Sequence, residues 1–387
     1  MNIFEYNKPF LSRPTWIEIN HTALEKNIQN LYKFIERNKE GNKKVSICAI
    51  IKSNAYGHGL VQIGGIVNKF NFIKILGITS VEEAYILRHI GVKKQILLLG
   101  SIYPFSNFKY LIEYNITPTV ASVYLLEEMN KFAKKHNVRI NFHLKIDTGM
   151  GRIGIIPENI NKFIESYSSM SNVFCEGIYT HFSSAANDKG YTMYQLRLFN
   201  QAYNRLISAG IRPKYVHAAN SAGIILYPES YFNMVRPGLA MYGMLPFKDV
   251  NKIVDLKPVL SLKSRIVFLK TLPKGRYISY SKTYCTKKKT KIATIPVGYA
   301  DGLLRKLSNI GKVIVKGRMC DIIGRVTMDM LMIDVTKVKN VEIGDEVIFI
   351  GQQKDKKITV EDVARWSETI NYEITTRLSE RIPRIVT

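Results

Sequence analysis

Lys52 follows a short apolar segment in a way that could make its side chain a reactive amine. Residues 45–51 are apolar except for Ser46, a pattern typical of a strand buried on both faces of a parallel sheet. Asn54 and Gly57 follow, and both residue types permit a tight turn. A lysine at the mouth of a buried strand loses hydration, which lowers the pKa of the amine and frees it to attack a carbonyl carbon. The alternative is an ordinary lysine that extends its charge into water.

Four other polar residues occupy similar positions along the chain. Asp147, His181, Asn220 and Arg236 each lie at or just beyond the end of a short apolar run. A parallel barrel gathers the carboxyl ends of its strands on one face, where barrel enzymes place their chemistry. The regular position of these residues therefore favours a barrel over a doubly wound sheet.

The apolar runs themselves predict the elements that would position these residues. Eight strands are expected at residues 45–52, 72–79, 95–100, 117–121, 140–147, 173–181, 215–220 and 234–238. Amphipathic segments lie between them, for example at residues 81–90, 123–136 and 191–209. Strands that alternate with helices predict an α/β fold, here an N-terminal (β/α)8 TIM-type barrel over residues 12–255.

A different pattern begins near residue 256. Short apolar runs separated by turn residues predict a mostly β C-terminal domain over residues 256–387. Its strands are expected at residues 260–269, 291–297, 312–315, 331–335 and 346–350. A single helix is expected at residues 360–369, with Thr359 as its N-cap. Residues 1–11 could pack with this domain.

The composition is that of an ordinary globular protein, with 46% hydrophobic and 22% charged residues. The net charge is +25, but the lysines are scattered and accompany no nucleic-acid-binding motif, so we expect neither a nucleic-acid nor a membrane partner. The cysteines are widely spaced and no metal-ligand cluster is visible, which predicts no disulfide framework and no metal. No apolar run approaches the roughly 18 residues of a membrane span, and the N-terminus lacks a signal-like core, so we expect a cytoplasmic protein.

Seven segments resemble, in the same order, motifs of the alanine racemases, enzymes of fold type III that depend on pyridoxal phosphate. The first is AIIKSNAYGHG, which begins at Ala49 and contains Lys52. The others are HLKIDTGMGR, ANSA, VRPGLAMYG, SYSKTY, GYADG and GRVTMD, which begin at His143, Ala219, Val235, Ser279, Gly298 and Gly324. The resemblance extends over about residues 16–384, nearly the whole chain.

The resemblance implies an alanine racemase that interconverts L-alanine and D-alanine and supplies D-alanine for peptidoglycan. Pyridoxal 5'-phosphate would be held as an aldimine on Lys52. The other cofactor-binding residues that the resemblance implies are Tyr56, Arg152, His181, Asn220, Ser221, Arg236, Gly238 and Leu239. Among these, Arg152 would also orient the substrate. Arg236 would face the pyridine nitrogen and, because a guanidinium cannot accept a proton, would leave that nitrogen unprotonated.

Racemisation needs two bases, one on each face of the substrate α-carbon. The resemblance assigns these roles to Lys52 and to Tyr280, which lies in the predicted second domain. Met328 would meet the substrate carboxylate, and the entry to the site would be lined by Tyr299, Arg325 and Asp329. In the family the second-domain residues reach the site of the partner subunit, so a homodimer with shared active sites is implied.

Several alternatives stay open at this point. Lys145 could be carbamylated, as is common in the family, or could pair with a neighbouring carboxylate. His181 could be a structural residue, and Tyr280 a half-buried strand residue. The substrate could also be serine, lysine or a broader set, and a fold-related decarboxylase or a non-catalytic cofactor carrier would share the barrel lysine. Three residues depart from the family pattern: Ser281, where glycine is usual, Thr327, where cysteine or serine is common, and Glu380.

Overall fold

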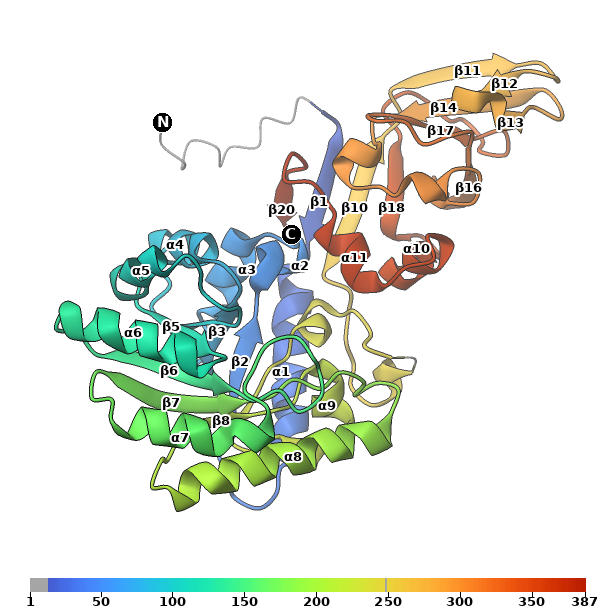
Figure 1. Ribbon diagram of the computed structural model, residues 1–387. Coiled ribbons are helices and arrows are strands. Elements are labelled where there is room, and N and C mark those ends of the chain that lie inside the picture. Colours follow the sequence, from blue (N-terminus) through green and yellow to red (C-terminus); the bar gives the residue numbers. More distant parts are fainter. Residues whose placement is uncertain (1–12, 248) are drawn as a thin grey trace.

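The computed structural model describes residues 13–247 and 249–387, and Figure 1 shows a barrel joined to a sheet-rich domain. Eight parallel strands close the barrel in sequential order. They are β2 (Ser46–Ile50), β3 (Ile73–Ile78), β4 (Gln95–Leu98), β5 (Ile116–Val120), β6 (Ile140–Lys145), β7 (Val173–Tyr179), β8 (Tyr215–His217) and β9 (Met234–Val235). The predicted barrel and all eight of its predicted strands are confirmed.

Helices surround the barrel strands (Figure 1). They are α1 (His21–Asn38), α3 (Leu60–Val67), α4 (Val81–His89), α5 (Phe108–Glu113), α6 (Val123–Lys135), α7 (Ile160–Ser168), α8 (Lys189–Ser208) and α9 (Ser221–Leu226), whereas α2 (Lys52–Tyr56) is a single turn with left-handed backbone angles. Several strands end before the predicted boundary because their polar ends begin the next element. Asn220, for example, is the N-cap of α9, and its side-chain oxygen accepts a hydrogen bond from the Gly223 N–H at 2.9 Å.

The second domain is built on a mostly antiparallel sheet. Its strand order is β11-β14-β17-β16-β15-β18-β10-β1-β20, and β19 pairs with β18. These strands are β1 (Thr15–Ile19), β10 (Leu260–Arg265), β11 (Phe268–Leu272), β14 (Thr290–Ile295), β15 (Lys312–Val315), β16 (Arg318–Ile323), β17 (Leu331–Asp334), β18 (Glu346–Gln353), β19 (Lys356–Ile358) and β20 (Arg384–Val386). A hairpin of β12 (Tyr277–Ile278) and β13 (Tyr284–Cys285) is not hydrogen-bonded to this sheet but packs against it, because Ile278 is buried with Ile292 and Ile323.

The beginning of the chain differs from the prediction. β1 falls within residues 12–255, which the sequence predicts to form the barrel domain, but it pairs with β10 and β20 in the second sheet. Its side chains alternate between buried and partly exposed, as in a strand that covers a core on one face only. The division of the chain near residue 256 stays a prediction. The expected packing of residues 1–11 lies outside the described residues.

Two further details of the second domain correct the sequence prediction. The run predicted as one strand at residues 260–269 is two strands, because β10 ends at Arg265 and β11 begins at Phe268. The single predicted helix is followed by another, so α10 (Val360–Trp366) and α11 (Asn371–Thr376) form a pair. The N-cap of α10 is Thr359, as predicted, and its hydroxyl accepts a hydrogen bond from the Asp362 N–H at 3.0 Å.

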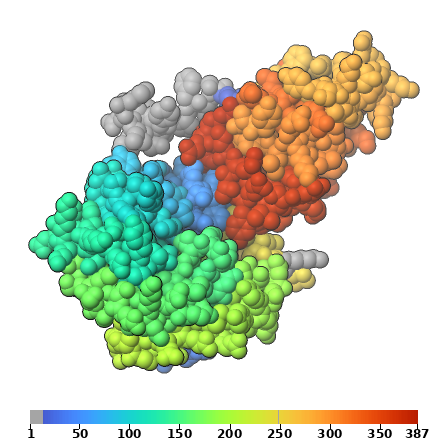
Figure 2. Space-filling model, in the orientation of Figure 1, coloured from blue at the N-terminus to red at the C-terminus, as the bar shows by residue number. Residues whose placement is uncertain are grey.

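The second domain packs against the barrel beside the turn that follows Lys52. Gly57 ends this turn with φ of +80°, and a Cβ at this position would lie 1.9 Å from the carbonyl oxygen of Thr375 in α11. The Arg384 guanidinium donates to the Gly57 carbonyl oxygen at 3.2 Å. In Figure 2 the C-terminal segment, in red, lies directly against the blue N-terminal part of the barrel. The position of Lys52 thus depends on both domains.

Gly57→Ala should lower the free energy of unfolding more than Gly91→Ala does. Both glycines have φ near +80°, at 80° and 82°, so alanine costs about 1–2 kcal/mol at either position. At Gly57 the new Cβ would also meet the Thr375 oxygen, which adds an overpacking cost of about 1–3 kcal/mol, whereas nothing lies within 4 Å at Gly91. Urea unfolding measures both variants, and equal destabilisation would contradict the close docking of α11.

Candidate active site

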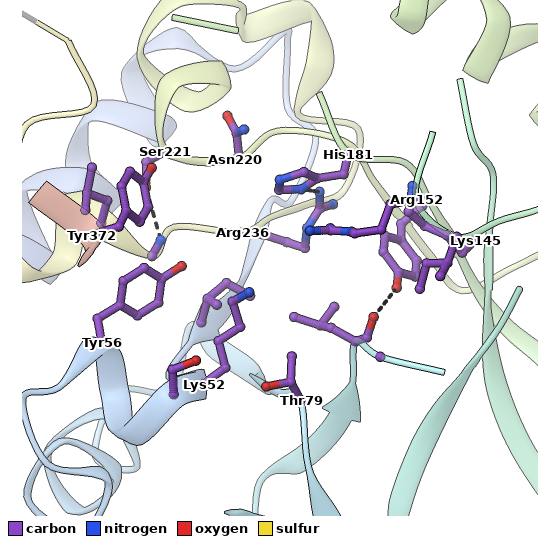
Figure 3. A pocket seen from close by; sticks show the side chains of 18 of the residues that line it. Lys52, Tyr56, Thr79, Lys145, Arg152, His181, Asn220, Ser221, Arg236 and Tyr372 are labelled. Carbon is purple, nitrogen blue, oxygen red and sulfur yellow. Dashed lines mark hydrogen bonds between the residues drawn. The ribbon is translucent and has the colours of Figure 1, made fainter. Parts of the chain in front are cut away.

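A cavity of about 540 Å³ opens at the C-terminal mouth of the barrel. Ten residues that the sequence singles out line it: Lys52, Tyr56, Lys145, Arg152, His181, Asn220, Ser221, Arg236, Gly238 and Leu239. Figure 3 shows Lys52 between Tyr56 on one side and Arg152 on the other. Four of the lining side chains are cationic, and no Asp or Glu is among the described residues that line the cavity. The cavity therefore suits an anionic ligand.

The turn after Lys52 has an unusual left-handed backbone. Residues 53–56 all have φ between 52° and 55°, although none is glycine, and such a conformation costs roughly 1–2 kcal/mol per residue. Glu83 offsets this cost, because its carboxylate accepts hydrogen bonds from the N–H of Asn54 at 3.2 Å and of Thr79 at 2.9 Å. The Asn54 side chain in turn accepts the Leu60 N–H at 2.6 Å. These bonds fix the backbone from which the Lys52 side chain extends.

The surroundings of Lys52 favour its neutral amine. Burial lowers the pKa of Lys52 below its usual value, and the positive charge of Arg152 lowers it further. The negative charge of Glu83 raises the pKa, but less than the other two effects lower it. An amine with a depressed pKa is available as a nucleophile or base at a lower pH than an exposed lysine.

Arg152 is positioned by a loop that folds around one carboxylate. Asp147 accepts hydrogen bonds from four successive backbone N–H groups, those of Gly149, Met150, Gly151 and Arg152, at 2.9–3.1 Å. Burial alone would raise the pKa of Asp147, but these backbone donors hold the pKa below its usual value. The carboxylate therefore stays ionised and organises the loop that brings Arg152 to the cavity.

Arg236 is a buried cation at the floor of the cavity. Its Nη2 donates to the carbonyl oxygens of Thr180 at 2.7 Å and Ala218 at 2.9 Å, and its Nη1 donates to His217 Nδ1 at 3.0 Å. Burial lowers the pKa of Arg236 to about 10, so the guanidinium is still protonated at neutral pH. Burial and the charge of Arg236 hold the pKa of His181 well below its usual value, so His181 offers hydrogen bonds without a charge.

Lys145 is buried beside the same cations. Burial, and then the charge of Arg236, lower the pKa of Lys145 to about 7. Its Nζ donates to the Ile146 carbonyl oxygen at 2.8 Å and lies 5.3 Å from the centre of the Tyr179 ring. Lys145 forms no ion pair with any carboxylate in residues 13–247 or 249–387, so the structure does not support the simple ion pair.

The opposite end of the cavity presents hydroxyl groups around a glycine. The Ser221 hydroxyl oxygen accepts hydrogen bonds from the N–H groups of Gly238 at 3.1 Å and Ala240 at 3.2 Å, which leaves its own O–H to donate elsewhere. A Cβ on Gly238 would lie 2.6 Å from the Tyr56 hydroxyl, so only glycine lets that hydroxyl approach the backbone. This end can donate several neutral hydrogen bonds to one group.

The sequence does not reveal every residue of the cavity. Tyr372 and Thr376 reach it from α11 in the second domain, and the Tyr372 ring lies 6.0 Å from the ring of Tyr56. α11 has only six residues and no side-chain cap, so no local signal points to it. Thr79 and Tyr179 also line the cavity, at or beyond the ends of β3 and β7, and only their position after a strand could have indicated them.

Five predicted residues lie outside the cavity of their own chain: Tyr280, Tyr299, Arg325, Met328 and Asp329. All belong to the second domain. Tyr280 is 69% exposed and Met328 is 55% exposed. The Ser279 hydroxyl donates to the Arg325 carbonyl oxygen at 2.7 Å, which holds the segment just before Tyr280 beside Arg325, and Asp329 pairs with Arg381 at 2.9 Å.

Family models match both parts of the chain. Residues 19–246 match the model described as "Alanine racemase, N-terminal domain", and residues 259–386 match "Alanine racemase, C-terminal domain". The chain belongs to the alanine racemase family. Its membership agrees with the observed fold, a barrel followed by a mostly β domain. Ser281, which follows Tyr280, has a left-handed φ of 61°. Glycine adopts this conformation without strain, which accounts for the glycine that is usual at this position in the family.

Individual alanine racemases are similar to this chain over nearly its whole length. An alanine racemase of Halothermothrix orenii is 42% identical over 375 residues, which covers 97% of each chain. Another, from Clostridium tetani, is 43% identical over 378 residues and covers 96% of this chain and 95% of the relative.

Solved alanine racemase structures resemble the fold equally well. The enzyme of Clostridium difficile 630 superposes with a TM-score of 0.90 at 35% identity, covering 97% of this chain and 96% of that one. The enzyme of Bacillus anthracis, solved with bound L-Ala-P, gives a TM-score of 0.89 at 36% identity over 97% and 95% of the two chains. Among the described residues, no helix combines the length and apolarity that crossing a membrane requires.

Glu83→Gln should lower the pKa of Lys52 further. The charge of Glu83 is the one effect among the three that raises this pKa, so its removal leaves burial and Arg152 unopposed. Trace acylation of the protein without cofactor, followed by mass spectrometry of the Lys52 peptide, gives the pH at which the amine becomes reactive. This pH should shift downward in Glu83→Gln and stay unchanged in Glu82→Gln, which alters an exposed neighbour. An upward shift would contradict the assigned electrostatics.

Proposed function

We propose that this chain catalyses the racemisation of alanine, with pyridoxal phosphate bound in the cavity at the mouth of the barrel. The observation that carries the proposal is the desolvated amine of Lys52 beside Arg152, in a cavity that no described carboxylate lines. Such an amine can form a bond with a carbonyl carbon, and the surrounding cations suit an anionic cofactor. The family and the named function of its similar members support the same reaction.

The residues of the cavity fit pyridoxal phosphate. The cofactor carries a phosphate group and a phenolic oxygen, and the cavity offers cations at one end and hydroxyl groups around Gly238 at the other. The Cβ-free surface of Gly238 leaves room where any larger residue would meet Tyr56. We propose that Tyr56, Ser221 and the backbone N–H of Leu239 bind the phosphate, and that Gly238, whose N–H donates to the Ser221 oxygen, lies against it with its open backbone surface. Asn220, whose oxygen already caps α9, would line the same end.

Lys52, Arg152 and Arg236 have different tasks in this reaction. When bound, pyridoxal phosphate supplies an electron sink that stabilises negative charge on the substrate α-carbon. Lys52 would hold the cofactor's carbonyl carbon through Nζ and then move the proton on one face of the α-carbon. Arg152 would bind the phenolic oxygen and orient the substrate. Arg236, which stays protonated, would donate a hydrogen bond to the pyridine nitrogen without protonating it.

The surroundings of Lys145 favour a carbamate on its side chain over an ammonium group. A pKa of about 7 leaves a large neutral fraction, and only the neutral amine adds to carbon dioxide. The addition forms an N–C bond and releases one proton, so a buried cation becomes an anion beside Arg236 and Arg152. That change would relieve the repulsion that these guanidinium groups exert on Lys145.

The second base would come from another copy of the chain. Tyr280 lies outside the cavity of its own chain and is largely exposed, so it is free to enter the site of a partner subunit. We propose a head-to-tail homodimer in which Tyr280 serves the face of the α-carbon opposite Lys52. Met328 would meet the substrate carboxylate, and Tyr299, Arg325 and Asp329 would narrow the entry.

A cytoplasmic location and the supply of D-alanine to peptidoglycan stay predictions from the family.

Conversion of L-alanine to D-alanine tests the function, and Tyr280→Phe tests the two bases. With the intact protein, a chiral assay across several L-amino acids should show D-alanine as the main product. Tyr280→Phe should reduce racemisation by about 10²–10⁴-fold. It should nevertheless keep exchange of the α-proton with D₂O for one enantiomer, because Lys52 still serves one face. Exchange lost equally for both enantiomers, or undiminished racemisation, would remove Tyr280 as a base.

Complementation between two inactive variants tests whether the sites are shared. In a head-to-tail dimer of Lys52→Ala with Tyr280→Ala, one site contains both substitutions and the other contains neither. Random mixing makes half of the dimers hybrid, so about a quarter of the wild-type activity should return. If Lys52 and Tyr280 act within one chain, the mixture stays as inactive as its components.

A further inference from the structure

Three buried side chains form a row from the cavity into the interior of the barrel. Arg236 follows β9, His217 ends β8 and His143 lies in β6. Arg236 Nη1 lies 3.0 Å from His217 Nδ1, and His217 Nε2 lies 2.9 Å from His143 Nδ1. The arginine is 3% exposed and both histidines are fully buried. The row thus connects Arg236, which lines the cavity, to His143, which does not.

The protons of this row can be assigned from the arginine. A guanidinium only donates, so the Nδ1 of His217 must be without a proton and accept. Burial, and then the charge of Arg236, hold the pKa of His217 well below its usual value, so the ring is neutral and carries its single proton on Nε2. That proton points at His143 Nδ1, which must therefore accept. His143 is also neutral, because burial lowers its pKa to about 3, so its own proton lies on Nε2.

His143 is a costly residue at this position unless its accepting nitrogen is needed. Its Nε2 is buried and has no hydrogen-bond partner in the part of the chain that the structure describes. An unsatisfied buried donor costs about 1–3 kcal/mol, which an apolar residue of similar size would avoid. The neighbouring strand also accommodates the ring: a Cβ on Gly177 would lie 2.6 Å from it. Both features are explained if Nδ1 of His143 is needed as the hydrogen-bond acceptor for Nε2 of His217.

We propose that His143 is a positioning residue for Arg236: it accepts the proton of His217 and so holds His217 in the one tautomer that can accept from the guanidinium. Without His143, the His217 proton can move to Nδ1, where it faces Nη1 of Arg236 and removes that bond. The backbone oxygens of Thr180 and Ala218 bind only Nη2, so they do not replace it. The consequence for catalysis rests on the proposed function, in which Arg236 faces the pyridine nitrogen.

Nitrogen-15 NMR of histidine-labelled protein without cofactor tests the tautomers directly. In the wild-type protein, His217 and His143 should both carry the proton on Nε2 and have a bare Nδ1. In His143→Leu, which removes the acceptor, the His217 signals should shift toward the Nδ1–H form. His143→Gln, whose side-chain oxygen can accept, should restore the wild-type pattern. A wild-type His217 with its proton on Nδ1 would overturn the proposal even if no variant folds, and so would an unchanged tautomer in His143→Leu.

The effect on the loaded enzyme is a separate measurement. Loss of one hydrogen bond to Arg236 should reduce kcat by about tenfold in His143→Leu, leave the KM for alanine nearly unchanged and alter the visible absorption of bound pyridoxal phosphate. His143→Gln should recover most of this loss. His136→Leu, an exposed histidine, is the matched control and should behave as wild type. Unaltered kcat and absorption in a folded His143→Leu would overturn the positioning role. If racemisation itself were absent, the tautomer experiment would still decide the proposal.

Discussion

Uncompensated positive charge is the physical constraint on which this site depends. Lys52, Lys145, Arg152 and Arg236 surround one cavity that no described Asp or Glu lines. Burial lowers the pKa of both lysines most, and the neighbouring guanidinium charges lower it further, so these lysines lose protons more readily than exposed lysines do. The same charges attract an anionic ligand. One arrangement thus produces both a reactive amine and a preference for an anionic ligand.

Carboxylates organise the site from behind without entering it. Glu83 accepts backbone N–H groups of the turn that follows Lys52, and Asp147 accepts those of the loop that carries Arg152. In the second domain the fully buried Asp301 accepts the Gly298 N–H at 2.9 Å and pairs with an arginine from each end of the chain. Glu83 and Asp147 thereby support the backbone around the cavity without lining it, and the charge of the cavity is left to the ligand.

Local sequence reveals the barrel because most residues of its strands are buried on both faces and several strands contain short apolar runs. The position of Lys52 and Arg236 after such runs indicates one common site, which the cavity contains. Features that depend on distant contacts are not readable in this way. The left-handed turn at residues 53–56 relies on Glu83, and β1 acquires its place only by pairing with β10 and β20. Tyr372 enters the cavity from a helix of six residues that carries no capping signal.

The role of Lys52 can be tested by locating the bond to the cofactor. Borohydride reduction of the protein loaded with pyridoxal phosphate, followed by peptide mass mapping, shows which lysine is attached. A pyridoxyl adduct should form on Lys52 and none on Lys145, the other lysine that lines the described cavity. An adduct on Lys145, or an unmodified Lys52 in fully loaded protein, would contradict the role of Lys52 as the amine that holds the cofactor.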